Sequence, residues 1–341
     1  MTQIYAPTWG SYSVPVPCFE YGLYRVAESE ISIFSQSQED QGIVRRYMLS
    51  TSHSQSLRLT QTLREKAVSG GKLIGLLPAG GKATRVAPLP CSKELYPIGF
   101  RSTDGEDSVR PKVACHYLLE KMRLADVTKA YIILRKGKWD IPAYFGDGKM
   151  LDMNLAYLIM GLPFGVPYTL DQAYPFVRDA TVAFGFPDII FQPDDAFATL
   201  LAKQLESKAD VVLGLFPAHQ PHKMDMVGFD MNGRISDIQI KPAQTHLSST
   251  WIIAVWSPAF TRFMHDYVSD LKRPNDKDKA DTNAEKQPEL FVGDIIQAAI
   301  NNNDIQIDTV LFSDGNYIDI GTPEDMVRAV QITNRQTENF S

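Results

Sequence analysis

The stretch LIGLLPAGGKATR, residues 73–85, decides the fold. It begins with an apolar run of the length of a buried strand and continues into two adjacent glycines, Gly80 and Gly81. Such a pair lets the backbone turn sharply and brings its N–H groups close to a ligand. Arg85 follows with a permanently charged, planar guanidinium, and Lys93 adds a second cation. The stretch therefore predicts a strand followed by a binding loop for a triphosphate.

The spacing around the glycines differs from that of two common phosphate motifs. It fits neither G-x-x-x-x-G-K-[ST] nor G-x-G-x-x-G. A Gly-Gly pair on its own favours an ordinary tight turn over a phosphate loop. The prediction of a phosphate loop therefore depends on the strand before the glycines and the two cations after them.

On the C-terminal side of this stretch, short apolar runs alternate with helical patterns, as in residues 129–135 (KAYIILR) and 196–208 (AFATLLAKQLESK). This alternation predicts an α/β fold with a doubly wound, mostly parallel, Rossmann-like sheet. Ligands of such sheets bind outside the carboxyl ends of the strands. Asn232-Gly233 lies between two strand-like runs and predicts an antiparallel hairpin insertion.

The domain organisation predicted is one domain over residues 71–341 with an N-terminal extension over residues 1–70. Residues 21–34 of the extension have strand-like composition, and residues 56–71 resemble a helix that ends at glycines. An oligomerisation or regulatory segment and an accessory element packed on the main domain are both open for this extension. The polar segment 272–289 is interpreted as a solvated loop, with a substrate lid as the alternative.

Bulk composition excludes several classes of protein. The chain has 341 residues, 44% hydrophobic and 22% charged, with a formal net charge of -6. The negative balance argues against a nucleic-acid binder, although a local basic cluster around small phosphates is compatible with it. Three cysteines at irregular spacing, no apparent secretory signal and no apolar stretch long enough for a membrane span indicate a cytoplasmic protein without a membrane partner.

Residues 79–97 are similar to the signature of the sugar-phosphate nucleotidylyltransferases, the family of glucose-1-phosphate thymidylyltransferases and UTP–glucose-1-phosphate uridylyltransferases. The family pattern A-G-G-x-G-T-R appears here as AGGKATR, residues 79–85, and is followed by Pro88 and by SKELYP, residues 92–97. Ala83 replaces the third glycine, and we expect its methyl group to tighten the loop or to demand a negative φ. The resemblance extends from Lys72 to the C-terminus and implies a doubly wound core.

The resemblance implies a Mg²⁺ site made of two acids. Asp188 follows a strand where the family has Gly-Asp, and Asp319 lies in YIDIGT, residues 317–322, which resembles W-x-D-x-G-T. Carboxylates together with substrate phosphates are the usual surroundings of Mg²⁺. The alternative for Asp319 is a cap of a turn. The nearby acids 194–195 are interpreted as residues at the N-terminus of a helix.

The resemblance also implies a sugar-phosphate site. Lys241 lies in Ile-Lys-Pro, which resembles the family's Glu-Lys-Pro, so Ile240 replaces the acid. Thr250 stands where the family has Thr-Gly, and Trp251 is expected to narrow the sugar pocket. Met224-Asp225 replaces a Tyr-Gly pair that the family often carries near the sugar.

Recognition of the base departs most from the family. Met160 stands where the family has a Gln, and Gly165 is the remaining candidate for a backbone contact with the base. The nucleotide-binding residues implied by the resemblance are Ala79, Gly80, Gly81, Thr84 and Gly165.

These residues together predict Mg²⁺-dependent transfer of a nucleoside monophosphate from a nucleoside triphosphate to a sugar 1-phosphate, with release of pyrophosphate. The catalytic residues implied are Arg85, Lys93 and Asp188: Arg85 with the glycine backbone on the β- and γ-phosphates, and Lys93 on the α-phosphate. The base, the sugar and the existence of a homo-oligomer stay open.

Two alternatives to this enzyme remain. A non-catalytic regulator that binds a nucleotide or a sugar on the same fold is favoured by the departures at Ala83, Pro187, Met160 and Asp225. A glycosyltransferase with a similar core is the third candidate, but the closest D-x-D string, residues 276–278, lies in the polar segment.

Overall fold

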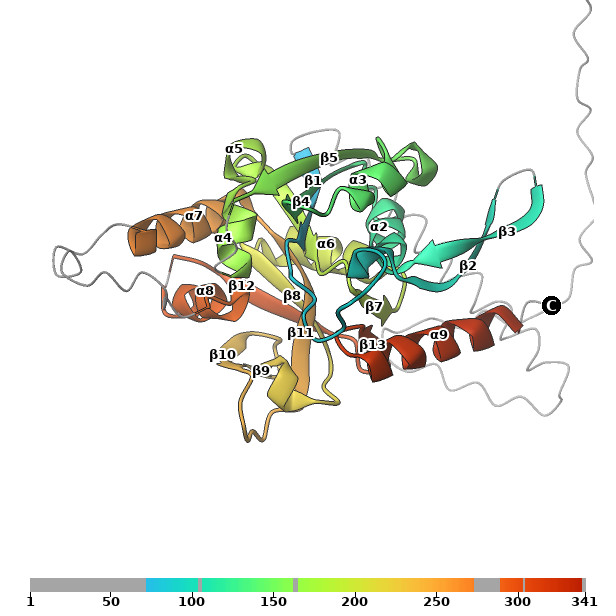
Figure 1. Cartoon of the computed structure of the whole chain (residues 1–341). Coiled ribbons are helices and arrows are strands. Elements are labelled where there is room, and N and C mark those ends of the chain that lie inside the picture. The colour runs from blue at the N-terminus through green and yellow to red at the C-terminus, as the bar shows by residue number, and fades with distance from the viewer. Residues whose placement is uncertain (1–71, 104–105, 162–164, 273–288, 303, 339–341) are drawn as a thin grey trace, which may run out of the picture. The chain divides into compact units, whose positions relative to one another are not determined.

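The computed structural model describes residues 72–103, 106–161, 165–272, 289–302 and 304–338 (Figure 1). All of them belong to one compact unit, Ser54–Ser341. The elements predicted in residues 1–70 and almost all of the polar segment 272–289 lie outside the described residues. The boundary at residue 70 therefore stays a prediction.

A mixed sheet of nine strands forms the centre of this unit. Four neighbouring strands form a parallel run: β1 (Lys72–Ala79), β4 (Lys129–Arg135), β5 (Asn154–Met160) and β6 (Ala180–Gly185). The others are β8 (Val211–Pro217), β9 (Asp225–Phe229), β10 (Ile235–Ile240), β11 (Ser249–Trp256) and β12 (Ile307–Leu311). The hydrogen-bonded order is β10-β9-β11-β6-β1-β4-β5, with β8 pairing to β11 and β12. The predicted doubly wound, mostly parallel core is confirmed. Beyond β6, β11 pairs antiparallel with β6, β8 and β9, whereas β8 and β12 form a further parallel pair.

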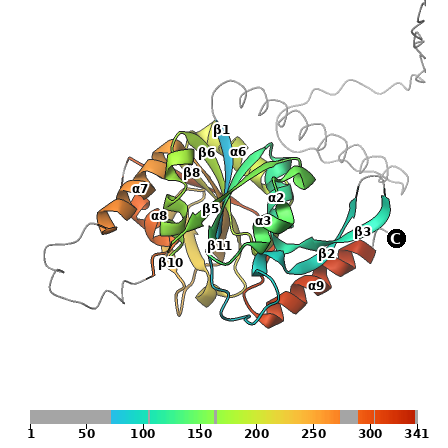
Figure 2. The same cartoon turned by 45° about the horizontal axis from the view of Figure 1, so that its top comes forward.

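Helices cover both faces of the sheet, which explains why its strands are apolar without alternation. Leu76 and Leu77 are consecutive on β1, yet they pack into two different buried clusters. The cluster around Leu77 includes residues of α2 and α6, and the cluster around Leu76 includes residues of α4, α7 and α8. In Figure 2, α2 accordingly lies on the opposite side of the strands from α7 and α8. These helices are α2 (Ala114–Leu124), α4 (Val166–Asp171), α6 (Ala196–Ser207), α7 (Pro258–Lys272) and α8 (Val292–Ile300).

The remaining elements are short or lie at the edge of the main sheet. Two small antiparallel sheets pair β2 with β3 and β7 with β13. The strands are β2 (Pro97–Thr103), β3 (Glu106–Val113), β7 (Ile189–Gln192) and β13 (Asn316–Asp319). The helices are α3 (Asp140–Phe145), α5 (Tyr174–Val177) and α9 (Pro323–Glu338), with 3-10 turns η1 (Lys93–Leu95), η2 (Lys149–Leu151) and η3 (Pro221–Lys223).

The hairpin β9–β10 is antiparallel, as Asn232-Gly233 predicts, but its turn is longer than a two-residue turn. The Gly233 N–H donates to the Asp230 carbonyl over 3.0 Å, and the Asp230 N–H donates to the Arg234 carbonyl over 2.9 Å. Gly233 has a φ of 76°, whereas Asn232 is not among the residues of positive φ. Only one residue of the pair therefore uses the left-handed conformation that motivated the prediction.

The start of α9 fixes the chain just after Asp319. The Asp325 N–H donates to the Thr322 hydroxyl over 3.3 Å, and that hydroxyl donates to the Asp325 carboxylate over 2.8 Å. Pro323 occupies the first helical position, where a missing N–H costs nothing. The Thr322 hydroxyl thus caps α9, and the Asp325 carboxylate holds that hydroxyl in place.

Of the helices in the described ranges, none combines the length and the apolar character that a bilayer crossing requires. Cys91 and Cys115 are free thiols.

Candidate active site

Two acids from distant parts of the chain meet at the small sheet β7–β13. Asp188 directly precedes β7, and Asp319 is the last residue of β13. The antiparallel register places Asp319 opposite Ile189, and the Ile320 N–H donates to the Asp188 carbonyl over 3.1 Å. The two predicted metal ligands therefore lie side by side.

The surroundings of Asp319 disfavour the charged form of its carboxyl group. Burial and the neighbouring charge of Asp188 raise the pKa of Asp319 to about 6, against the opposing effect of Lys93 and Arg85. Its Oδ1 is buried without a hydrogen-bond partner. A divalent cation would neutralise the two acids and coordinate this oxygen, so the residues present fit Mg²⁺. Among the described residues no group of three or more His, Cys, Asp or Glu forms a metal site, so substrate phosphates and water would complete the coordination.

Lys93 interacts with the two acids and lines the same cleft as the glycine turn. Its ammonium forms an ion pair with Asp188. Burial favours the neutral amine, but the carboxylates of Asp188 and Asp319 outweigh it and raise the pKa of Lys93. Lys93 is therefore a fixed cation at neutral pH.

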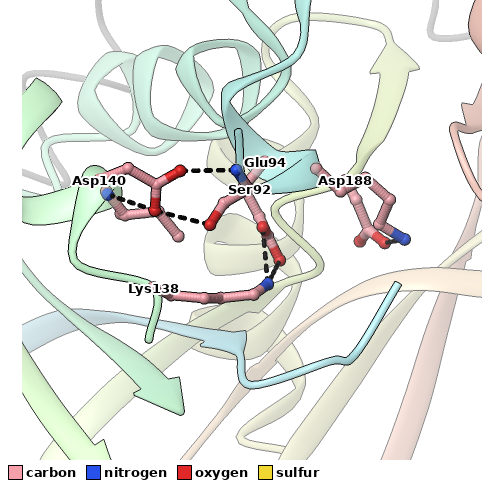
Figure 3. A network of polar contacts seen from close by, with 7 residues as sticks. Ser92, Glu94, Lys138, Asp140 and Asp188 are labelled. Carbon is pink, nitrogen blue, oxygen red and sulfur yellow. Dashed lines mark hydrogen bonds and ion pairs between the residues drawn. The ribbon is translucent and has the colours of Figure 1, made fainter. Parts of the chain in front are cut away.

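The residues on both sides of Lys93 are held by side chains from the segment after β4 (Figure 3). The Ser92 N–H and hydroxyl donate to the Asp140 carboxylate over 2.6 and 2.7 Å. The Lys138 ammonium donates to both oxygens of Glu94 over 2.6 and 2.8 Å, and both residues are buried. These contacts fix the 3-10 turn η1 and thereby position Lys93.

A cleft of about 580 Å³ opens beside this ion pair. Among its lining residues are Gly80, Gly81, Thr84, Lys93, Asp188 and Gly165. The structure thus brings together most of the predicted nucleotide-binding residues with two of the predicted catalytic ones. Ala79, by contrast, is buried beneath the turn as the last residue of β1.

Met160 packs beneath the glycine turn and is only 2% exposed. A Cβ at Gly80 would lie 2.7 Å from its sulfur atom, so any side chain there would have to displace the Met160 side chain. Met160 therefore leaves the cleft open and does not line it. Gly165 has a φ of 133°, and a Cβ there would lie 2.2 Å from the Leu290 carbonyl oxygen. Both Gly165 and Thr169 line the cleft.

The backbone conformation of Ala83 contradicts one expectation from the sequence. Its φ is 53°, so the methyl group does not impose a negative φ on the loop. The backbone keeps a left-handed conformation, at a cost of roughly 1–2 kcal/mol for a residue with a side chain.

Arg85 lines a different, smaller pocket of about 40 Å³ with Asp319, His219 and Lys223. A Cβ at Gly321 would lie 3.0 Å from its Nη2 atom, close to the Asp319 carboxylate. The guanidinium therefore lies near the metal-site acid and opposes the rise of the Asp319 pKa, but it does not line the large cleft. The role of Arg85 on the β- and γ-phosphates stays a prediction.

Of the predicted sugar-phosphate residues, Lys241 directly follows β10 and Thr250 is the second residue of β11. Lys241 has a φ of 43°, and its ammonium lies 3.7 Å from the centre of the Phe291 ring. Thr250 is fully buried, and its hydroxyl donates to the Asp225 carbonyl over 2.9 Å, so Thr250 aligns β9 and does not present a free donor. Trp251 is also buried, packed against Phe184 and Phe186, and it does not line the cleft of the glycine turn; its effect on a sugar pocket stays a prediction.

The structure shows a pairing of Asp225 that the sequence did not predict. It pairs directly with Ile240 across β9–β10, next to Lys241, so the hairpin carries a carboxylate opposite the position where the family acid is missing. Burial raises the pKa of Asp225 to about 6, although Lys241 opposes this shift. Its Oδ1 and the Trp251 Nε1 are buried without a hydrogen bond of good geometry. Finding this carboxylate required the register of the hairpin, which the sequence alone does not give.

Three comparisons place this geometry among known proteins. Residues 74–336 match the family model described as "Nucleotidyl transferase". The chain is 23% identical over 262 residues to the low-salt glycan biosynthesis nucleotidyltransferase Agl11 of Haloferax volcanii, over 76% of this chain and 65% of that protein. The chain therefore spans less than two thirds of the length of this relative.

Two solved structures share the fold. One is assigned as a glucose-1-phosphate thymidylyltransferase from Bacillus anthracis, with a TM-score of 0.62 and 20% identity, over 76% of this chain and 95% of that one. The other is a UDP-glucose pyrophosphorylase complexed with UDP-glucose, with a TM-score of 0.61 and 15% identity, over 77% of this chain and 98% of that one. At these identities the likeness shows the fold alone. The family match, in contrast, covers most of the chain and includes the glycine turn, Lys93 and both acids, and on that ground the chain belongs to the nucleotidyl transferase family.

Proposed function

We propose that this protein is a Mg²⁺-dependent sugar-1-phosphate nucleotidylyltransferase, which forms a nucleotide-sugar and pyrophosphate from a nucleoside triphosphate and a sugar 1-phosphate. The observation that carries the proposal is the convergence of Asp188, Asp319 and Lys93 beside the cleft of the glycine turn. A site for nucleotide binding alone has no need for two adjacent acids at the position of the transferring phosphate.

The reaction forms one bond and breaks one. An oxygen of the sugar 1-phosphate bonds to the α-phosphorus, and the bond from that phosphorus to the oxygen bridging to the β-phosphate breaks, so pyrophosphate leaves with the electron pair. Such transfers depend mainly on positioning and charge neutralisation, and no covalent intermediate with the protein is required.

Each group of residues has a distinct part in this scheme. The backbone of Gly80 and Gly81 binds the phosphates, and Lys93 exchanges its contact with Asp188 for one with the α-phosphate. Asp188 and Asp319 would hold Mg²⁺, and the ion would supply positive charge near the transferring phosphate. Lys241 orients the sugar phosphate at the other side of Asp188.

The regulator and glycosyltransferase alternatives have less support. Ala83, a departure that favoured a regulator, keeps the left-handed backbone that a glycine would adopt there. The D-x-D string of residues 276–278 lies outside the described residues. Neither alternative gains a specific observation from the site.

The test is a substrate panel with the full chain. Nucleoside triphosphates and sugar 1-phosphates are combined pairwise, and pyrophosphate release is measured with Mg²⁺ and with a chelator. We expect release that requires both substrates and the metal. Release that is absent for every pair, while triphosphates still bind and raise the melting temperature, would support the regulator and reject the enzyme.

A further inference from the structure

A second large cleft, of about 500 Å³, adjoins the nucleotide cleft along the segment of residues 82–93. Lys82, Ala83 and Lys93 line both clefts, so the two clefts meet along this segment. The far wall comes from the end of β4 and the residues after it, including Arg135 and Lys138. Neither the sequence motifs nor the proposed chemistry gives this cleft a function.

Positive charge dominates its lining. The cations are Lys82, Lys93, Arg135 and Lys138, and among the described residues that line the cleft the acid is Asp140. Asp140 already accepts hydrogen bonds from Ser92, and from the Ile141 N–H over 3.1 Å. Lys93 and Lys138 are committed to the carboxylates of Asp188 and Glu94. The excess charge therefore belongs to the remaining two cations.

Lys82 and Arg135 form no ion pair within the part of the chain that the structure describes. The Arg135 Nε atom is buried without a hydrogen-bond partner. An unpaired, desolvated guanidinium donor is costly, and a bound anion would satisfy it. The two residues come from different elements, so they face this cleft from two sides.

The order of strands relates this cleft to the reaction. Ala79 pairs with Leu134, so Arg135, at the carboxyl end of β4, lies level with Gly80. On the other side of β1 comes β6, which Asp188 follows, and beyond β11 lie β9 and β10 with Lys241. Four groups therefore follow one another across the sheet, at the carboxyl ends of its parallel strands. In spatial order they are the proposed sugar-phosphate lysine, the metal-site acid, the glycine turn and Arg135.

This order matches an in-line displacement, in which the entering and leaving oxygens lie on opposite sides of the phosphorus. If the sugar phosphate enters from the side of Lys241, pyrophosphate leaves toward β4. Two strand spacings, about 10 Å, separate β6 from β4, a span that a diphosphate and an extended arginine side chain cover together.

We propose that the cleft lined by Lys82 and Arg135 binds the pyrophosphate part of the triphosphate and is the route by which inorganic pyrophosphate leaves. The direction in which pyrophosphate leaves rests on the proposed function. The inference adds Arg135 and Lys82 to the substrate-binding residues. The guanidinium of Arg135 donates to the terminal phosphate in a bidentate manner, and Lys82 neutralises a second oxygen.

Calorimetric titration of the full chain with inorganic pyrophosphate, without any nucleotide, tests this assignment. Arg135→Gln is compared with Lys136→Gln, a matched control on the next residue, which is exposed and does not line the cleft. We expect Arg135→Gln to weaken pyrophosphate binding by about tenfold or more, the usual effect of losing a hydrogen bond to a charged group, and Lys136→Gln to have little effect. Equal binding by the two variants would overturn the assignment.

Kinetics add a measurement that a structural defect would not reproduce. Arg135→Gln should raise KM for the triphosphate, and for pyrophosphate in the reverse direction, while KM for the sugar 1-phosphate stays unchanged. If Arg135→Gln does not fold, Lys82→Gln, on the exposed loop, carries the same expectation against the same control.

The outcomes separate this inference from the proposed function. Pyrophosphate binding that depends on Arg135, in a protein that transfers no nucleotide, would leave the cleft assignment standing and reject the enzyme. If the protein releases pyrophosphate from its substrates but neither Arg135 nor Lys82 affects pyrophosphate binding, the proposed function stands and the cleft assignment is rejected.

Discussion

Ala83 is the residue where this phosphate loop departs most clearly from the family pattern. Its left-handed backbone, with a φ of 53°, costs roughly 1–2 kcal/mol, and glycine would lose about 0.5–1 kcal/mol more backbone entropy on folding. We therefore expect Ala83→Gly to leave the free energy of unfolding unchanged or raise it by up to about 1.5 kcal/mol.

Thermal denaturation of Ala83→Gly beside Ala87→Gly checks this expectation. Ala87 lies in the same loop and is not among the residues of positive φ, so its replacement should be slightly destabilising. A loss of stability in Ala83→Gly as large as that in Ala87→Gly would mean that the loop does not hold residue 83 in the left-handed region.

Asp225 gives the hairpin beside Lys241 a dependence on pH. Its pKa is raised from 3.8 to about 6, so the folded state binds a proton that the unfolded chain has already lost between these values. The stabilising effect of the protonated carboxyl is complete below about pH 4 and is lost as the pH rises through about 6. The replacement side chain in the variant Asp225→Asn does not titrate, so the variant does not lose this stabilisation. The melting temperature of Asp225→Asn relative to that of the wild type should therefore rise between pH 4.5 and 7.5.

Asp237→Asn, a carboxylate removed from the same hairpin, is the control for this pH series. A difference between wild type and Asp225→Asn that stays constant over the whole series would refute the raised pKa.

At the scale of elements, the 3-10 turn η1 depends on the buried pair Glu94–Lys138. Removing one partner leaves a buried charge without compensation, which typically costs 3–5 kcal/mol. We expect Lys138→Met to lower the free energy of unfolding by about this amount and Glu94→Gln combined with Lys138→Met to recover part of it.

Urea denaturation measures these effects. Arg178→Met serves as the comparison, because the Arg178–Asp179 pair is exposed and such pairs contribute about 0–1 kcal/mol. If Lys138→Met proves as mild as Arg178→Met, the buried pair does not stabilise η1.

The elements also show why some of the site was predictable and some was not. The strand β1, its glycine turn and the cap at Thr322 follow from local sequence, because glycine and capping residues act on their immediate neighbours. The contacts of Ser92 with Asp140 and of Glu94 with Lys138 join segments that share no motif, so only the folded chain reveals them. The pairing of β7 with β13 involves four residues on each strand, too few for a periodic pattern.

On the scale of the whole molecule, the alternation of strands and helices predicted the doubly wound core, because two covered faces require continuous apolar strands. The position of the two acids was predicted only through the resemblance to the family. The base stays undetermined because the position of the family's Gln is occupied by Met160, which packs beneath the glycine turn, and because Gly165 offers only backbone atoms. The sugar stays undetermined because the family acid is absent at Ile240 and Asp225 lies opposite that position.

The central claim is that Asp188 and Asp319 act as one unit on the transferring phosphate. Because either acid alone would hold the metal poorly, Asp188→Asn, Asp319→Asn and the double variant should each lose roughly the same activity, on the order of 100- to 1000-fold. Asp194→Asn removes a carboxylate that pairs with Lys121 away from the cleft and should leave the rate of transfer near that of the wild type.

The most direct measurement is Mg²⁺-dependent pyrophosphate release by these four variants under saturating substrates. Equal large losses in both single variants and the double variant are the predicted result. Near-native release by either single variant, or losses that multiply in the double variant, would contradict a shared metal site.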